Sequence, residues 1–141
     1  MSKITDKFKD YALKGGVPVE ESQLEGGQKL FRMGMQLPDR EVIPVAIIID
    51  GKEDPAVDYQ ITYSKLAYVK DYNQRGEALD EINRLNRVHT GYFHLCLAGD
   101  GEIYLRTLGR VSEDVRPLYE IIMAGQQVLR ILVKESKLFK N

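Results

Sequence analysis

His94 and Cys96 come closest in this sequence to a pair of side chains that could do chemistry. They are two residues apart in a segment whose alternation predicts a strand, so both side chains point to the same face. Imidazole and thiolate are zinc ligands, but a zinc site needs three or four of them, and His89 is the one other candidate nearby. We therefore expect no metal site, and interpret the pair as a satisfied histidine and a packed cysteine.

Other motifs with chemical potential are incomplete. The acidic residues between Asp50 and Asp58 lack the alternating ligands and the closing glutamate of a calcium loop. Gly99-Asp100-Gly101 lacks the third glycine of a phosphate-binding loop and precedes a strand rather than a helix. No serine has the glycine framing of a nucleophile elbow. We expect no catalytic residue and no cofactor, and so a protein that is not an enzyme.

Charge and hydropathy exclude two kinds of partner. The formal net charge is -1, and the arginine-rich segment 75–87 also carries Glu77, Asp80 and Glu81. Nucleic-acid and anionic-membrane surfaces need a concentrated positive field, so we expect neither partner. The first residues have no apolar core of signal-peptide length, and the longest apolar run, 42–49, is too short to cross a bilayer. One cysteine fits a reducing compartment, and we expect a cytoplasmic protein.

The composition indicates one domain. A chain of 141 residues with 43% hydrophobic residues can build a single core. We assign residues 1–141 to this domain, without repeats or low-complexity segments.

The first half of the sequence predicts a helix and three strands. Apolar residues three to four apart over 4–12, followed by Gly15-Gly16, predict a short amphipathic helix. The polar, acidic segment 19–27 is interpreted as a loop. Alternation predicts strands at 31–37 and 57–64. The uninterrupted apolar run 42–49 predicts a strand covered on both faces, although Pro44 cannot donate a ladder hydrogen bond. Short turns join the three strands into an antiparallel meander.

The middle of the sequence predicts a helix over 74–87, with Asn73 as its N-cap. The segment Leu66 to Asp71 is ambiguous, because it reads either as a continuation of the third strand or as a linker.

The segment after this helix predicts a β-hairpin with a defined register. A two-residue loop at Asp100-Gly101 would put the apolar residues of the two strands on different faces. A three-residue loop instead pairs Leu97 with Ile103 and requires a positive φ at its last residue, Gly101. One face of the hairpin is then apolar. The other face carries Tyr92, His94, Cys96, Glu102, Tyr104 and Arg106.

The last element is a long helix that begins near Ser112. One apolar stripe carries Val115, Leu118, Ile122, Gly125, Leu129 and Leu132. A second stripe carries Ile121, Val128 and Ile131. The apolar arc is wider than a single sheet face requires, which indicates a partner surface.

The order helix, three-strand meander, helix, hairpin, helix resembles the fold of the class I type III secretion chaperones, and more closely the YbjN-like family of bacterial sensory transduction regulators. The residues that carry the resemblance are Leu85-Asn86, the segment 91–97, Gly99 to Ile103, and the stripe of the last helix. It implies an α+β fold with an antiparallel sheet backed by helices, frequent dimerisation, and a protein-binding or regulatory role with no established catalytic residues.

These observations lead to one functional hypothesis and one alternative. The hypothesis is a non-enzymatic regulator or chaperone-like protein that forms a homodimer and binds another protein. The candidate surface consists of Val45, Ile47, Ile49, Ile121, Val128 and Ile131. The alternative is a small-molecule sensor or enzyme with a pocket between the sheet and the last helix.

Overall fold

The computed structural model describes residues 3–38 and 40–140 and has an α+β fold. Its helices are α1 (Lys3–Lys14), α2 (Arg75–Val88) and α3 (Arg116–Glu135). Its strands are β1 (Glu20–Gln23), β2 (Lys29–Met35), β3 (Ile43–Ile49), β4 (Ala56–Tyr68), β5 (His94–Leu97) and β6 (Glu102–Ser112). Short 3₁₀ turns lie at Glu25–Gly27, Tyr72–Gln74 and Lys137–Phe139.

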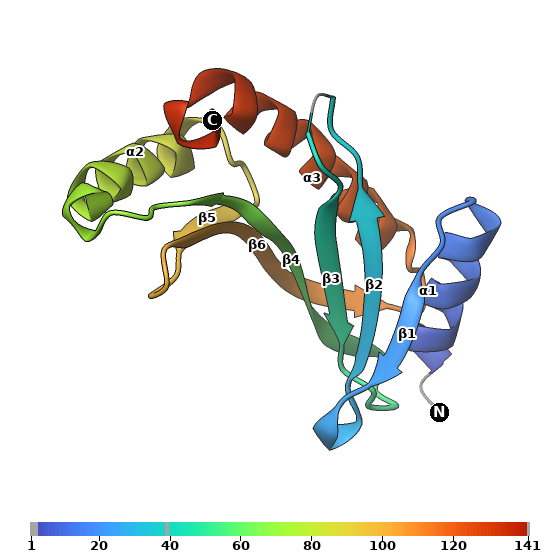
Figure 1. The fold of residues 1–141 in the computed structure, drawn as a ribbon. Helices are drawn as coiled ribbons and strands as arrows, with labels where there is room; N and C mark the ends of the chain where they lie inside the picture. The colour runs from blue at the N-terminus through green and yellow to red at the C-terminus, as the bar shows by residue number, and fades with distance from the viewer. Residues whose placement is uncertain (1–2, 39, 141) are drawn as a thin grey trace.

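The described strands form one antiparallel sheet in the order β1-β2-β3-β4-β6-β5. The helices pack on one side of this sheet, with α3 crossing it and α1 and α2 at opposite ends (Figure 1). We call the side under the helices the inner face and the opposite side the outer face. The predicted fold class and the predicted order of helices and strands are confirmed.

The strand β1 lies in the segment that the sequence analysis interprets as a loop, and that interpretation is wrong for residues 20–23. Its residues are polar and carry no strand signal, but Glu21 binds two lysines from different elements. Its carboxylate lies 2.6 Å from Lys29 Nζ on β2 and 3.0 Å from Lys9 Nζ on α1. The hydrogen bond from Lys29, followed by that from Lys9, lowers the pKa of Glu21. These ion pairs hold β1 against β2 and under α1.

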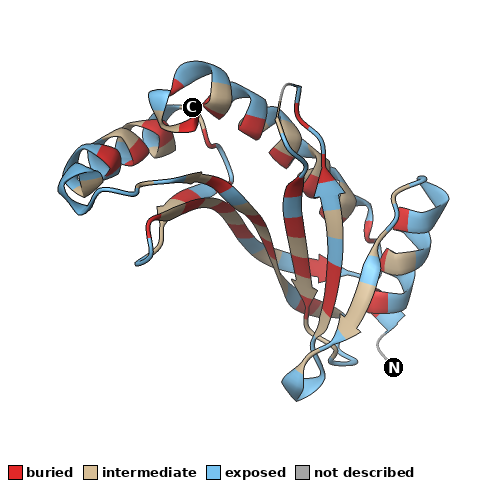
Figure 2. Ribbon diagram, in the orientation of Figure 1, coloured by how far each residue is buried: buried red, intermediate tan, exposed pale blue. Residues whose placement is uncertain are grey.

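The strand β3 alternates between the two faces. Ile43, Val45, Ile47 and Ile49 are buried on the inner face, whereas Pro44 is exposed and Ala46 and Ile48 are partly exposed. Figure 2 shows the same alternation as colour bands along the strands. The prediction that this strand is covered on both faces is wrong, because the helices cover one face only.

The strand β4 bends at a bulge. Tyr63 pairs with Leu105 and Ala67 with Ile103, so β4 has two more residues than β6 between these pairs. Lys65 takes the positive φ of 58° that the bulge requires. Its N–H donates to Glu102 Oε2 at 2.8 Å.

The chain after β4 resolves the ambiguity over Leu66 to Asp71. The strand continues to Tyr68, and the side chain of Asp71 then accepts a hydrogen bond from the Asn73 N–H at 2.9 Å. The predicted N-cap at Asn73 is therefore wrong. Asp71 caps a 3₁₀ turn that leads into α2.

The hairpin has the predicted register. Leu97 pairs with Ile103, the Ala98 N–H donates to the Glu102 carbonyl at 2.8 Å, and Gly101 has a φ of 95°. A side chain at Gly101 would also overlap the backbone carbonyl of Val69. The glycine is thus required by both its conformation and its close approach to the chain after β4.

Asn86 on α2 covers the free edge of β5. Its amide Nδ2 donates to the Leu95 carbonyl at 3.0 Å, and its Oδ1 accepts from the Leu95 N–H at 2.8 Å. One side chain therefore takes the place of a neighbouring strand at this residue. Thr90, which is buried, donates to the same Asn86 side chain at 3.3 Å. The asparagine that carries the family resemblance thus has a structural role.

Substitution of Gly101 by valine tests the turn. We expect a loss of about 1–2 kcal/mol or more in the free energy of unfolding, because a β-branched residue is strained at positive φ. Gly99→Ala is the matched control, since a Cβ at Gly99 meets nothing within 4 Å. Thermal or denaturant unfolding measures both variants. Equal stability of the two variants would contradict the register.

Substitution of Asn86 by alanine tests the cover of the sheet edge. We expect a loss of roughly 1–3 kcal/mol, because two backbone groups of Leu95 lose their partner. Asn86→Asp keeps an acceptor and should lose less. Asn83→Ala, on the exposed side of α2, is the control. Urea unfolding and amide exchange at Leu95 provide the measurements, and unchanged exchange there would show that Asn86 does not protect the edge.

Candidate functional site

The predicted surface residues separate into two groups. Val45, Ile47 and Ile49 lie in the core with at most 2% of their surface exposed, so they offer no surface in the single chain. Ile121 and Val128 on α3 are half-buried, and Ile131 is 41% exposed. The structure therefore leaves the second stripe of α3 accessible and does not bring it together with the β3 residues at one surface.

The space between the sheet and α3 is filled by side chains. The Tyr63 ring is fully buried and its hydroxyl donates to the Ile122 carbonyl at 2.7 Å. Burial raises the pKa of this phenol. The ring lies so close to Gly125 that a Cβ there would overlap it. A ligand at the place of the predicted pocket would have to displace Tyr63 or α3.

The outer face of the sheet carries apolar side chains that no helix covers. Cross-strand register places Leu30, Ile48, Gln60 and Leu108 in one row across β2, β3, β4 and β6. Leu30 is buried, with 7% of its surface exposed, whereas Ile48 is partly exposed and Leu108 is 58% exposed. Ile48 and Leu108 are therefore candidates for a contact surface. We call these four residues the apolar row.

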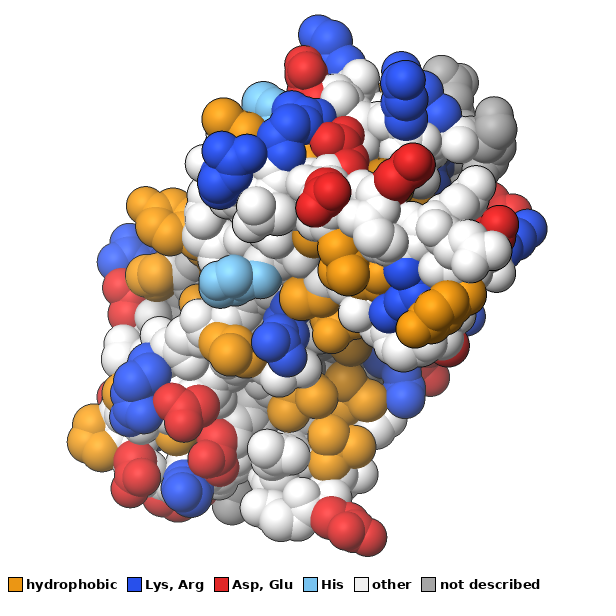
Figure 3. Space-filling view, turned by 90° about the vertical axis from the view of Figure 1, so that its left-hand side faces the viewer, with side chains coloured by type: hydrophobic (Ala, Val, Ile, Leu, Met, Phe, Trp, Pro, Cys, Tyr) orange, Lys and Arg blue, Asp and Glu red, His pale blue; other side chains and the backbone are white. Residues whose placement is uncertain are grey.

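A second row, one step further along the strands, carries positive charge. It consists of Arg32, Ala46, Thr62, Arg106 and His94 in register across β2, β3, β4, β6 and β5, and we call it the cationic row after its two arginines. Glu20 on β1 pairs with Arg32 and continues the register with one negative charge. Small side chains separate the two arginines. Figure 3 shows hydrophobic side chains gathered in the middle of one side of the molecule, with lysine or arginine side chains among them.

The arginines of the cationic row have weak partners. Arg32 is exposed and, within the described residues, its side chain reaches only the Ser22 hydroxyl, at 3.5 Å. The Nε atom of Arg106 is buried and has no hydrogen-bond partner among the described residues. By contrast, Arg110 on the same face binds the Asp58 carboxylate at 2.8 Å. The two arginines of the cationic row can thus bind a carboxylate from outside the chain.

The residues that opened the sequence analysis also lie on the outer face. Cys96 and Tyr104 pair across β5 and β6, beside the pair of His94 and Arg106. The Cys96 thiol donates to the His94 carbonyl at 3.7 Å rather than to the imidazole. Burial first, and then the neighbouring Cys96, raise the pKa of Tyr104. Within residues 3–38 and 40–140, no three His, Cys, Asp or Glu side chains are grouped to hold a metal ion.

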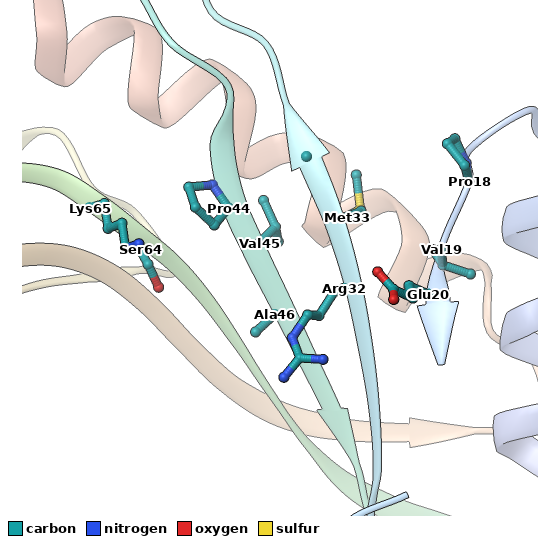
Figure 4. A pocket seen from close by; sticks show the side chains of 11 residues that line it. Pro18, Val19, Glu20, Arg32, Met33, Pro44, Val45, Ala46, Ser64 and Lys65 are labelled. Carbon is teal, nitrogen blue, oxygen red and sulfur yellow. The ribbon is translucent and has the colours of Figure 1, made fainter. Parts of the chain in front are cut away.

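A shallow hollow of about 650 Å³ lies at the β1 end of the outer face. Small residues of β2, β3 and β4 form its floor, among them Gly34, Ala46 and Ser64. Figure 4 shows Arg32 extending toward Ala46, while Glu20 points from β1 toward β2. The hollow is thus the part of the outer face on which Arg32 lies.

Sequence reasoning missed both rows. The signal was present in β3, where Pro44 and Ala46 interrupt a run of large β-branched residues at alternate positions. Alternation in β2 likewise placed Arg32 opposite the buried residues. Neither signal shows which strands are neighbours, and the rows depend on that order.

Comparison with known proteins gives no family for this chain. No protein-family model matches it, and no curated protein matches it. In the described part of the chain, no helix is both long and apolar enough to span a membrane.

Substitution of Gly125 by alanine tests the close packing of α3 on the sheet. We expect a loss of roughly 1–3 kcal/mol in stability, because a methyl group must push the helix away from Tyr63. Gly76→Ala on α2 is the matched control. It has open space around its Cβ and should be neutral or stabilising by up to about 1 kcal/mol. Differential scanning calorimetry measures both, and a Gly125 variant as stable as the control would mean that the interior is loosely packed.

Proposed function

We propose that this chain is a non-catalytic, protein-binding regulator or chaperone-like protein that acts as a homodimer. The observation that carries the proposal is the outer face of the sheet, where Ile48 is partly exposed and Leu108 is 58% exposed, with no helix over them. Apolar side chains left on a sheet face are stabilised when a partner removes them from water, by roughly 25 cal/mol per Å².

The dimer contact is assigned to α3. Its second stripe, Ile121, Val128 and Ile131, flanks the buried stripe and stays half-exposed or exposed. A stripe on a single helix suits an isologous contact, in which the same surface of both copies meets. The outer face of the sheet then remains available for a different protein.

The family resemblance and the free thiol support the same proposal. The resemblance to the YbjN-like family and to the secretion chaperones implies dimerisation and protein binding of this kind. A cytoplasmic location is proposed because the one cysteine, Cys96, is a free thiol. The alternative of a sensor or enzyme with an inner pocket has less support, since Tyr63 and Gly125 occupy that space.

Light scattering at micromolar concentration tests the dimer. We expect twice the chain mass of 16.1 kDa for the wild-type protein, and a shift toward the monomer for Ile131→Glu, because a buried charge at the contact is costly. Leu79→Glu is the matched control, since Leu79 on α2 is 49% exposed and lies outside the stripe. A monomer mass for the wild-type chain would sink the homodimer.

A further inference from the structure

The two rows on the outer face define the chemistry of a partner. We infer that this face binds an extended polypeptide segment that carries carboxylates beside apolar side chains, with Arg32 and Arg106 binding the carboxylates. The inference rests on the proposed protein-binding function and names the class of partner.

The charge of the outer face points to an acidic partner. Arg32 and Arg106 lie in one row with His94, and with Glu20 of β1 at the end next to Arg32. Neither arginine forms an ion pair with a described carboxylate, so the row keeps an excess of positive charge. Three other arginines of the described chain do bind carboxylates: Arg84 binds Glu81 at 2.7 Å, Arg110 binds Asp58 at 2.8 Å and Arg116 binds Asp114 at 2.9 Å. Arg32 is exposed and Arg106 is partly exposed, so a carboxylate of a partner can approach both side chains from the outer face.

The spacing of the two arginines sets the separation of the acidic residues in the partner segment. They lie three strand spacings apart, on β2 and β6 with β3 and β4 between them, which corresponds to roughly 14 Å between backbones. An extended chain covers that distance in about four residues, at roughly 3.4 Å per residue. Two acidic residues four apart in an extended segment would therefore reach both guanidinium groups.

The neighbouring apolar row sets the positions of the apolar residues in the partner segment. It lies two residues further along the same strands, with Ile48 beside Ala46 and Leu108 beside Arg106. A segment lying between the rows would direct alternate side chains to opposite sides, carboxylates toward the arginines and apolar side chains toward Ile48 and Leu108. The pattern acid, apolar, any residue, apolar, acid fits both rows.

The same charges argue against two other occupants. A second copy of this face would bring two arginines and one carboxylate, Glu20, against the same set, so both rows would keep an excess of positive charge. A nucleic acid would use the arginines but would leave the apolar row without a partner, because its backbone is charged along its whole length.

Fluorescence anisotropy with labelled peptides tests the inference. The probe is Ser-Glu-Leu-Ser-Leu-Glu-Ser, and the controls replace both glutamates by lysine or place them side by side at equal composition. We expect saturable binding of the probe to the wild-type protein, weaker binding of both control peptides, and weaker binding in high salt.

Variants of the protein locate the contact. Arg32→Gln and Arg106→Gln should each weaken binding of the probe by roughly three- to tenfold, because each removes a charge-assisted hydrogen bond at a partly solvated site. Arg32 is exposed, so its variant keeps the test valid even where Arg106→Gln perturbs the fold. Arg87→Gln on α2, also exposed, is the matched control and should bind as the wild type does.

Several outcomes would overturn the inference. They are absence of saturable binding, equal binding of the lysine peptide, wild-type affinity in both arginine variants, and tighter binding of an oligothymidine strand that competes with the probe. Light scattering on the same samples separates the two levels. A dimer that fails to bind the probe refutes the acidic partner only, whereas a monomer also refutes the proposed homodimer.

Discussion

The contact between Tyr63 and the backbone of α3 sets the distance between the helix and the sheet. Gly125 has no side chain, so the helix comes close enough for the Tyr63 hydroxyl to donate to the Ile122 carbonyl. At that distance Leu118, Leu129 and Leu132 are buried against the inner residues of the strands. This packing covers the inner face, and the described helices all lie on that side of the sheet. The outer face is left to solvent as a consequence.

Prediction from sequence succeeded where local geometry decides the structure. The hairpin register follows from the length of the loop and from the positive φ of Gly101, and both are local. The stripe of the last helix follows from its periodicity, and its residues from Val115 to Leu132 are buried as predicted. The predicted start of this helix near Ser112 is wrong, because β6 continues to Ser112 and α3 begins at Arg116.

Prediction failed where the neighbours of a strand decide the structure. The run 42–49 is apolar at nearly every position, and periodicity alone does not show that one of its faces stays uncovered. The strand β1 is polar, and ion pairs of Glu21 with Lys9 and Lys29 hold it, which depends on elements distant in sequence. For the same reason the candidate surface could be predicted for α3 but not for the sheet. The two rows exist only once β2, β3, β4 and β6 lie side by side.

The residues of each strand have two different roles, according to the face on which they lie. The inward set of each strand builds the core, while the outward set arranges Ile48 and Leu108 in one line and Arg32 and Arg106 in the next. Because strand order fixes both lines, the spacing between the backbone positions of the two arginines is as rigid as the sheet itself. A binding surface of this kind needs no moving part, and it fits a protein whose function is to hold another polypeptide rather than to transform a substrate.

The central claim, that one face of the sheet is closed and the other open, is tested most directly by methyl NMR in the presence of a soluble paramagnetic agent. Three consecutive isoleucines, 47, 48 and 49, provide the comparison within a single strand. Strong relaxation enhancement at the Ile48 methyl groups, with Ile47 and Ile49 protected, is the predicted result. Equal protection of all three would mean that the outer face is covered, and would contradict the account.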